Sequence, residues 1–470
     1  MPGAARAASQ YDPSVAGGGV IEAVKHPARL VVGAFVTLIV TGTVLLWLPI
    51  ANDGGGTIGF DNALFMATSA ATVTGLASLN VADFSLFGEI VIMMLMQIGG
   101  FGIMTIGAVL VILVWSRVGL RQRMLTQAEI GAVDLGELKQ LLLGIARITL
   151  VVEGCIAIIL TLRFWQRGDE DGPLSAAYSG VFHSIAAFNN SGLSLYPDNL
   201  TRFVGDPVIV FTISAGFIIG GLGFPIIVEL RRRMQSRADP RAARQPRWSL
   251  HARITLITTA ALIVIGVACV IAFEWANPAT FGPLGTFDKL LAGWFQGVSP
   301  RTAGFNTVDI GGMHESTLVV TTILMFIGAG PASTSGGIKV TTFAVLAFAL
   351  WSEIRGNTDV NAFRRRIPPS VIRQGLTVVL LSIGLVITAS LLLMGLDDLT
   401  LTPALFEVTS AFGTVGLSTG ITAILSEPAQ IVLVVVMLAG RVGPVTFVTA
   451  LALHEHSRAY RYPEERPIIG

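Results

Sequence analysis

The amino-acid sequence predicts an all-α polytopic membrane protein made of four M1-P-M2 repeats, in which a re-entrant half-helix (P) lies between two spanning helices (M1 and M2). The first observation is composition: 52% of the 470 residues are hydrophobic and 13% are charged, whereas soluble domains carry about 25% charged residues. The second is a set of charge-free apolar stretches that reach the roughly 20 residues needed to cross a bilayer. The third is a glycine motif that occurs four times.

The glycine motif defines a fourfold internal repeat. It aligns on Gly75, Gly192, Gly304 and Gly416, which are 117, 112 and 112 residues apart. An aromatic residue stands ten positions before each glycine, and a bulky apolar residue follows each one. The aromatic residues are Phe65, Phe182, Trp294 and Phe406. Four matches at near-constant spacing are the sequence signature of repeated structural units.

Each repeat contains a long apolar segment, a short helix-like stretch that ends at the glycine, and a second long apolar segment. The first segments are 30–50, 141–162, 254–273 and 374–394, and the second are 90–115, 208–228, 318–351 and 431–453. Together they predict eight spanning helices. The short stretches hold about ten to twelve residues, too few to cross a bilayer. We therefore expect four re-entrant half-helices, which membranes tolerate where the backbone lines a water-filled cavity.

The repeats and their connections divide the whole chain. We place the repeats at 30–115, 141–229, 254–351 and 374–453, the connections at 116–140, 230–253 and 352–373, and the tails at 1–29 and 454–470. Of the 31 Lys and Arg residues, 23 lie in these tails and connections and 5 in the connections on the glycine side. The positive-inside rule therefore predicts a multi-pass cell-membrane protein with cytosolic N- and C-termini. The most basic connection, 230–253, fits contact with anionic membrane lipid or docking of a cytosolic protein.

Other residue types exclude several classes of function. Cys155 and Cys269 lie within apolar segments, which excludes a disulfide scaffold and a cysteine-rich metal site. The six histidines are scattered, and no acid or nucleophile constellation indicates an enzyme. The formal net charge of +1 gives no sign of a nucleic-acid partner. Structural polar contacts are expected for Arg147, Glu153, His183 and Glu407.

Four re-entrant loops of one chain can surround a single pore, and the residues before the glycines suit a cation site there. The candidate cation-binding residues are Thr72, Val73, Thr74, Gly75, Asn189, Asn190, Ser191, Gly192, Arg301, Thr302, Ala303, Gly304, Gly413, Thr414, Val415 and Gly416. Backbone carbonyls replace the water of a cation when successive ones point the same way, and glycine adopts the necessary backbone at low cost. No carboxylate occurs in these segments, so a dehydrated monovalent cation fits better than a divalent one. For any single glycine, the alternative is a helix C-cap.

A second recurring feature lies in the second apolar segments. Gly99, Gly328 and Gly440 each follow the motif glycine by 24 positions, and Gly220 follows it by 28. In the third repeat the stretch 328–339 combines glycines with a proline and three hydroxyl residues, so we expect a broken segment inside the pore, the alternative being a packing kink. Placing the charge of Arg441 within a bilayer costs free energy, so we expect its side chain to face this cavity or to pair with another group. The candidate gate residues are Gly328, Gly330, Ser333, Thr334, Ser335, Gly336, Gly337, Lys339 and Arg441.

These motifs resemble the Trk/Ktr/HKT superfamily of potassium transporters. The similar segments include TVTGL (72–76), FNNSGLS (188–194), SPRTAGFNT (299–307), TVGLSTG (414–420), STSGGIK (333–339), GRVGP (440–444) and the closing YPEERPIIG (462–470). The resemblance covers the chain from about residue 25, and eight spans with this ending are typical of the KtrB branch. Two departures are the serine in NNSG and the small residues Ala332 and Ser335 in the loop.

The resemblance implies potassium translocation through a channel-like pore, a homodimer, and a cytosolic ring of KtrA-like nucleotide-binding regulatory subunits. By position, the segments 72–75, 189–192, 301–304 and 414–416 would form the selectivity filter, and the loop 328–337 with Arg441 would form the gate. A serine in place of Gly75 is associated with sodium transport in this family. No cofactor is expected in this chain: K+ is the substrate, Na+ is a candidate activator or coupling ion, and nucleotide is expected on the regulatory partner.

The sequence thus favours the pore subunit of a regulated potassium uptake system. A sodium or mixed-cation transporter of the same superfamily is the alternative. An ion-coupled secondary transporter for an organic solute would show two repeats rather than four. A voltage-gated channel would need an arginine at every third position of a span, and no such series is present.

Overall fold

The computed structural model describes residues 27–53, 56–102, 105, 135–238 and 248–443. The helices are α2 (Pro27–Trp47), α3 (Phe60–Ala71), an unlabelled helix (Leu86–Gly102), α5 (Leu135–Arg167), α6 (Pro173–Phe188), α7 (Pro207–Leu222), α8 (Phe224–Ala238), α9 (Leu250–Glu274), α10 (Thr286–Val298), α11 (Glu315–Phe326), α12 (Val340–Ile354), α13 (Pro369–Asp397), α14 (Leu401–Gly413) and α15 (Glu427–Val442). Residues 1–26 of the N-terminal tail and most of the connection 116–140 lie outside the described residues, as does the C-terminal tail.

Short elements complete the described part of the chain. The 3-10 turns are η1 (Pro49–Ala51), η2 (Val81–Asp83), η3 (Thr201–Phe203) and η4 (Thr422–Ile424). A two-stranded antiparallel hairpin follows α12, with β1 (Asn361–Ala362) paired to β2 (Arg365–Arg366). Local chemistry explains several helix starts: the Asp206 carboxylate accepts hydrogen bonds from the first amides of α7, and the Ser249 hydroxyl caps α9 in the same way.

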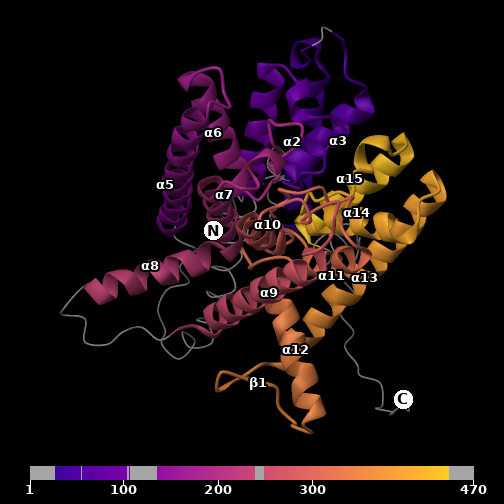
Figure 1. Cartoon of the computed structure of the whole chain (residues 1–470). Coiled ribbons are helices and arrows are strands. Elements are labelled where there is room, and N and C mark those ends of the chain that lie inside the picture. The colour runs from indigo at the N-terminus through magenta and orange to yellow at the C-terminus, as the bar shows by residue number, and fades with distance from the viewer. Residues whose placement is uncertain (1–26, 54–55, 103–104, 106–134, 239–247, 444–470) are drawn as a thin grey trace, which may run out of the picture.

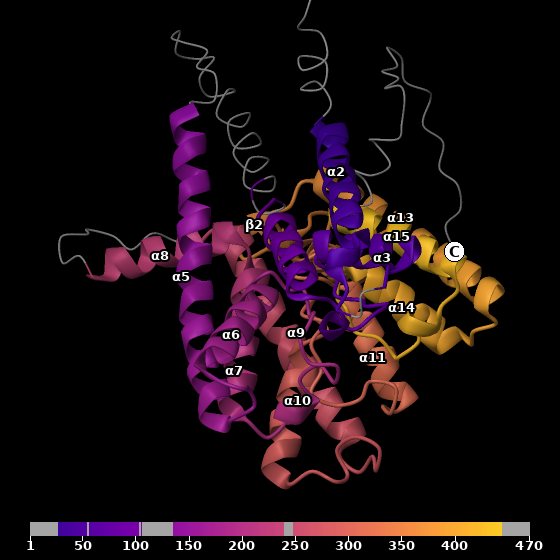
Figure 2. The same ribbon diagram turned by 90° about the horizontal axis from the view of Figure 1, so that it is seen from above.

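Each long helix packs against the short helix that follows it. The pairs are α2 with α3, α5 with α6, α9 with α10, and α13 with α14. The long helices α5 and α13 stand at opposite sides of the bundle (Figures 1 and 2). This arrangement brings the C-terminal ends of four short helices, 12 to 16 residues long, to the middle of the molecule.

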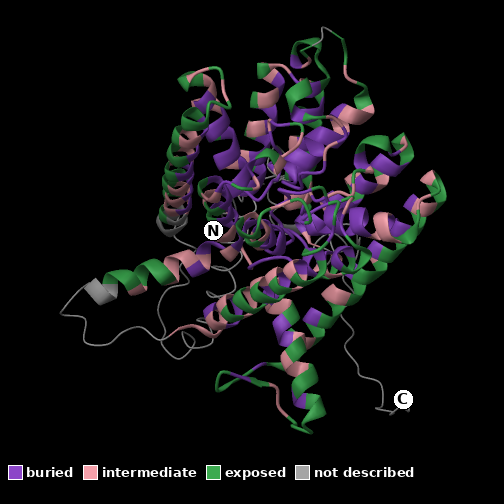
Figure 3. Ribbon diagram, viewed as in Figure 1, coloured by how far each residue is buried: buried purple, intermediate pink, exposed green. Residues whose placement is uncertain are grey.

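Burial follows this arrangement. The centre is buried, whereas the outward faces of α5, α9 and α13 are exposed (Figure 3). The exposed side chains on these faces are largely apolar, as in Leu150, Val264 and Leu391. A helix that is apolar on its outward face as well as its inward face is typical of a membrane span. Three of the four motif aromatics are completely buried, and Trp294 is half-buried with its indole N–H donating to Ser214 Oγ at 3.3 Å.

Three helices of the described chain are long and apolar enough to cross a bilayer: Leu142–Arg167, Leu250–Glu274 and Pro369–Asp397. They coincide with the predicted first segments of repeats two, three and four. Shorter apolar helices occupy Val31–Trp47, Leu86–Gly102, Glu315–Phe326 and Val340–Ile354. Eight spans therefore remain a prediction, since the predicted segments 90–115 and 431–453 run partly outside the described residues.

The predicted segment 208–228 is not one straight helix. It breaks at Gly223, where φ is +88°, and the axis turns by 101° between Pro207–Leu222 and Phe224–Gln235. A Cβ at this glycine would lie 2.4 Å from the Pro331 carbonyl oxygen, so the turn also depends on a close approach to a distant part of the chain. The third repeat is interrupted as its glycines predict, with no helix in the described residues between Phe326 and Val340.

Candidate functional site

The four motif glycines share one backbone conformation three to six residues after the ends of the short helices. All have positive φ: +91° at Gly75, +73° at Gly192, +76° at Gly304 and +94° at Gly416. This left-handed region is open to glycine and costs other residues about 1–2 kcal/mol. This backbone path therefore favours glycine, as the backbone of a helix C-cap also does.

The residue two positions before each motif glycine is also left-handed. These residues are Val73, Asn190, Thr302 and Thr414, with φ of +54°, +61°, +68° and +48°. The sequence predicts glycine alone in such conformations, so the structure corrects that prediction. Strained backbone of this kind costs on the order of 1–3 kcal/mol per residue and persists where the surroundings fix it. The same pair of left-handed residues, two positions apart, thus recurs in all four segments.

The four glycine segments close into a ring through their backbones. Each motif glycine abuts the carbonyl oxygen of the residue before the next motif glycine. A Cβ built on Gly75 would lie 1.8 Å from the Ser191 carbonyl oxygen, and one on Gly192 would lie 2.8 Å from that of Ala303. A Cβ on Gly304 would lie 2.2 Å from the Val415 carbonyl oxygen, and one on Gly416 would lie 2.5 Å from that of Thr74. The last contact returns to the first segment, so segments more than 100 residues apart in sequence form one closed circle of carbonyl groups.

Hydrogen bonds hold the ring to the short helices. The Gly75 amide donates to Ser69 Oγ at 3.0 Å, and the Gly416 amide donates to Ser410 Oγ at 3.1 Å. Two buried hydroxyl oxygens of the ring segments, Ser191 Oγ and Thr414 Oγ1, have no hydrogen-bond partner in the described protein. Unpaired oxygens of this kind fit a site whose partner is a cation or water rather than a protein group.

A buried polar network lies behind the second segment. The Asn189 amide nitrogen donates to Gln97 Oε1 at 2.8 Å and to Glu153 Oε1 at 3.1 Å. Gln97 in turn donates to Glu153 Oε2 at 3.2 Å. The side chain of Asn189 is therefore anchored to α5 and to the helix Leu86–Gly102. Glu153 makes a structural polar contact, as the sequence predicts, but its partner is a ring segment.

The loop 328–337 lies against one side of the ring. Thr334 Oγ1 donates to Asn190 Oδ1 at 3.0 Å, and Asn190 donates to Thr302 Oγ1 at 3.2 Å. A Cβ at Gly336 would come within 2.4 Å of Thr414 Oγ1. Backbone contacts extend the loop to neighbouring helices, since the Gly330 amide donates to the Gly221 carbonyl at 2.8 Å. The loop thus touches the second and fourth ring segments here, and Arg301 of the third segment contacts it as well.

Two buried arginines are directed at this loop rather than at a carboxylate. Arg441 donates through Nη1 to the Thr334 carbonyl and through Nη2 to the Gly99 carbonyl at 3.1 Å. Arg301 donates through Nη2 to the Gly328 carbonyl at 2.9 Å. Neither arginine forms an ion pair with a carboxylate of the described chain. The side chain of Arg301 therefore binds the start of the loop, and Lys339 donates to the Ser335 carbonyl near its end.

The recurring glycines of the second segments have a different role from the ring glycines. A Cβ at Gly99, Gly220 or Gly440 would lie 1.9, 2.0 or 1.9 Å from the carbonyl oxygen of Ala71, Phe188 or Phe412, respectively. These carbonyls stand four positions before the ring glycines, at the ends of the short helices. Gly328 departs from this pattern and approaches the Gly336 carbonyl within its own loop.

A polar depression opens on the other side of the ring. Its volume is about 250 Å³, and its lining includes Gly75, Gly192 and Gly416 together with Asn199 and Asp309. Asn199 donates to the Gly192 carbonyl at 3.0 Å. Nearby, beyond the end of α5, burial acts to raise the pKa of Glu170, but hydrogen bonds from Ser175, Ser179 and Tyr196 outweigh it, so the net pKa is lowered and the carboxylate stays ionised.

Comparison with known proteins identifies the family. The TrkH family model, described as a cation transport protein, matches residues 17–462. The chain belongs to the TrkH family. It is 39% identical over 445 residues to the Ktr system potassium uptake protein B of Bacillus subtilis, covering 94% of this chain and 96% of that protein. The Ktr system potassium uptake protein B of Vibrio alginolyticus is 38% identical, with 94% of both chains covered.

A solved structure supports the fold of this TrkH-family chain. The crystal structure of the potassium transporter TrkH from Vibrio parahaemolyticus aligns with a TM-score of 0.70 at 18% identity, covering 91% of this chain and 85% of that one. This identity is low, so the match concerns the fold. The relatives are named as transport proteins, which agrees with the absence of an enzyme motif in the sequence.

The structure brings the predicted residues of the TrkH-family chain together and adds others. The predicted gate residues Thr334, Gly336 and Arg441 lie beside the ring. His183 Nε2 and Ser194 Oγ share a hydrogen bond of 2.9 Å, and Glu407 accepts a hydrogen bond from Ser418 Oγ at 2.9 Å. Sequence reasoning missed the serines, although each stands two positions after a motif glycine and eleven positions after its partner. It also missed Gln97 and Asn199, whose contacts cross between repeats or loops.

Proposed function

We propose that this chain is the ion-conducting subunit of a regulated potassium uptake system of the Ktr type. The closed circle of backbone carbonyls formed by four glycine segments carries this proposal. Such a circle offers several oxygens at similar distances to a cation that has lost its water. The names of the Bacillus subtilis and Vibrio alginolyticus relatives support potassium as the cation.

The chemistry of the ring favours a dehydrated monovalent cation. The C-terminal, partially negative ends of α3, α6, α10 and α14 lie beside it, which stabilises positive charge. The ring segments contain no carboxylate, whereas divalent cations are usually held by carboxylates. The segments 72–75, 189–192, 301–304 and 413–416 together act as the selectivity filter, mainly through backbone oxygens.

The loop 328–337 and Arg441 act as the gate below this filter. The loop carbonyl of Thr334 holds the guanidinium of Arg441, and the hydroxyl of Thr334 holds Asn190 of the filter. A positive charge beside the pathway raises the barrier for K+. Displacement of the loop releases Arg441 from this carbonyl and opens the path.

The proposal includes the organisation that the sequence predicts. Four M1-P-M2 repeats with eight spans surround one pore in the cell membrane, with both termini in the cytosol. The chain forms a homodimer, and a cytosolic ring of KtrA-like subunits binds the regulatory nucleotide. No cofactor belongs to this chain itself, and Na+ acts as an activating or coupling ion. The relatives named as parts of a Ktr system support a separate regulatory component.

A sodium or mixed-cation transporter is the less supported alternative. The Enterococcus hirae potassium/sodium uptake protein NtpJ is 32% identical over 94% of this chain. However, the first filter position is Gly75, and the two Ktr relatives above are more similar to this chain than NtpJ is.

Growth of an uptake-deficient bacterium at low potassium tests the proposed function. Expression of the chain should restore growth, and co-expression of a KtrA-like subunit should make the restored uptake respond to ATP. Purified chain alone should bind no ATP. The proposal would be contradicted if the chain reaches the membrane but growth at low K+ is not restored, either with or without the KtrA-like subunit.

A further inference from the structure

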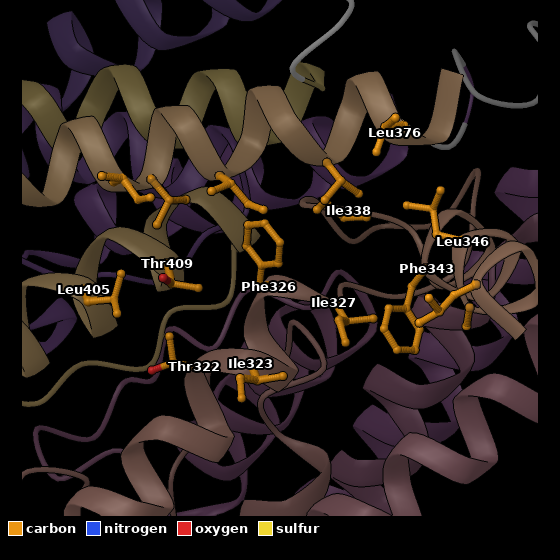
Figure 4. Close-up of a pocket in the computed structure, with 16 residues that line it drawn as sticks. Thr322, Ile323, Phe326, Ile327, Ile338, Phe343, Leu346, Leu376, Leu405 and Thr409 are labelled. Atoms are coloured by element: carbon orange, nitrogen blue, oxygen red, sulfur yellow. The ribbon is translucent and has the colours of Figure 1, made fainter. Parts of the chain in front are cut away.

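An apolar groove opens beside the loop, between α11, α12, α13 and α14 (Figure 4). Its volume is about 790 Å³. Phe326 and Ile327 line it at the end of α11, Ile338 and Phe343 line it at the start of α12, and Ile383 belongs to α13. The groove is distinct from the ring and from the polar depression above it, since it shares no lining residue with the depression.

The lining excludes water as a stable occupant. Apart from two threonines, every described lining residue is aliphatic or aromatic. The hydroxyl of Thr322 already donates to the Leu318 carbonyl at 2.7 Å, so Thr409 alone remains as a polar wall. A buried water needs two to four polar partners. The lining therefore suits an apolar occupant.

The groove opens at membrane depth. Its α13 wall runs from Leu376 to Ile387, in the middle of a helix that is long and apolar enough to cross a bilayer. The same helix carries Leu380 and Leu391 exposed on its surface, so the groove is continuous with an apolar outer face. An acyl chain matches both the apolar lining of the groove and its membrane-spanning wall. Bilayer lipid supplies such chains along this face.

The groove also contacts both ends of the loop. Ile327 and Ile338 pair through an isolated parallel bridge, and both are buried against the groove. Separating these two residues would break the bridge and remove the wall on which an occupant packs. The close contacts of an apolar chain with both isoleucines therefore stabilise the bridged arrangement.

We propose that the acyl chain of a membrane lipid occupies the groove lined by Ile327, Ile338 and α13 and stabilises the loop 328–337 in the arrangement described here. The binding site stands on the groove alone, whereas its effect on ion flux rests on the proposed function of the loop as a gate. Lipid thus acts as a regulatory ligand of the loop.

Photolabelling tests the binding site. Full-length protein is placed in vesicles of phosphatidylethanolamine and phosphatidylglycerol that contain a phosphatidylglycerol with a photoactivatable acyl chain, and the labelled peptides are mapped. We expect label on the groove faces of α11, α12 and α13. Ala347→Trp fills the groove and should abolish this label, whereas Ala260→Trp, at an exposed alanine of α9 outside the groove, should leave it unchanged. The inference is overturned if the groove is labelled no more strongly than the outer face of α9. It is also overturned if the groove is still labelled in Ala347→Trp.

The same vesicles separate binding from gating. K+ flux through the wild type and Ala260→Trp should change when short acyl chains replace long ones, and Ala347→Trp should lose this dependence. If K+ flux through all three proteins responds equally to acyl-chain length, the proposed effect of lipid on the loop is overturned. A wild type that is labelled but carries no K+ would instead contradict the proposed function. An Ala347→Cys disulfide between two copies in membranes would assign the groove to a second chain and overturn the lipid site.

Discussion

Replacing Gly75 with serine tests whether carbonyl position in the ring determines selectivity. A Cβ on Gly75 would lie 1.8 Å from the Ser191 carbonyl oxygen, and real Cβ atoms essentially never approach an atom closer than 3.0 Å. The oxygen therefore has to move by about 1 Å, a displacement that costs on the order of 10²-fold in precisely organised sites. We expect the preference for K+ over Na+ to fall by at least about tenfold, equivalent to about 1.4 kcal/mol.

Backbone strain alone needs a control, because Gly75 has a φ of +91°. Gly168, just past the end of α5, has a φ of +74°, and a Cβ at this position would meet no atom within 4 Å. Gly168→Ser thus carries a similar strain of about 1–2 kcal/mol without a collision in the ring. Uptake of K+ and Na+ into vesicles gives the preference of both variants. An unchanged ratio in Gly75→Ser, or an equal loss in Gly168→Ser, would refute the reasoning.

Three further predictions concern the surroundings of the ring. Arg441→Ala should raise K+ flux and weaken its dependence on the regulatory subunit while selectivity is kept; unchanged flux and regulation in vesicles would contradict the gate. Gly440→Ala places a Cβ 1.9 Å from the Phe412 carbonyl oxygen, so stability should fall by about 1–3 kcal/mol. Thermal unfolding in detergent checks this against Gly384→Ala, where nothing lies within 4 Å. Glu153→Ala removes a hydrogen-bond acceptor from the network behind the second segment and should lower the preference for K+ over Na+. Glu153→Gln keeps one acceptor oxygen and should retain part of this preference. Equal K+/Na+ uptake ratios in both variants and in the wild type would show that the network does not support selectivity.

Much of the local structure was predictable because local sequence specifies it. The aromatic residue ten positions before each glycine, and the glycine itself, located four short helices and the ends at which they stop. Positive φ at Gly75 and its three counterparts follows from the same pattern, since glycine alone reaches that region cheaply. The interruption after Phe326 was also predictable, because glycine and proline do not support a continuous helix.

Contacts between segments were less predictable. Gly220, Gly221, Gly223 and Pro225 disfavour a continuous helix in 208–228, but the sequence does not show that the bend brings Gly223 against the Pro331 carbonyl, more than 100 residues away. Asn189 was expected among the cation-binding residues, yet its amide group is directed toward Gln97 and Glu153. Side-chain direction at such positions follows from which helices lie behind the loop, and that depends on the packing of the whole bundle.

The sequence by itself determined the membrane class, the four copies of the glycine motif and the glycines that need a left-handed backbone, because hydropathy, spacing and φ preference act over short stretches of chain. Only the tertiary structure decided that each ring glycine meets the carbonyl of the next segment, and that Arg441 and Arg301 bind loop carbonyls rather than carboxylates. These contacts join residues from separate repeats or from distant parts of one repeat. Their geometry is fixed by the close approach of packed helices, which the order of residues along one segment does not specify.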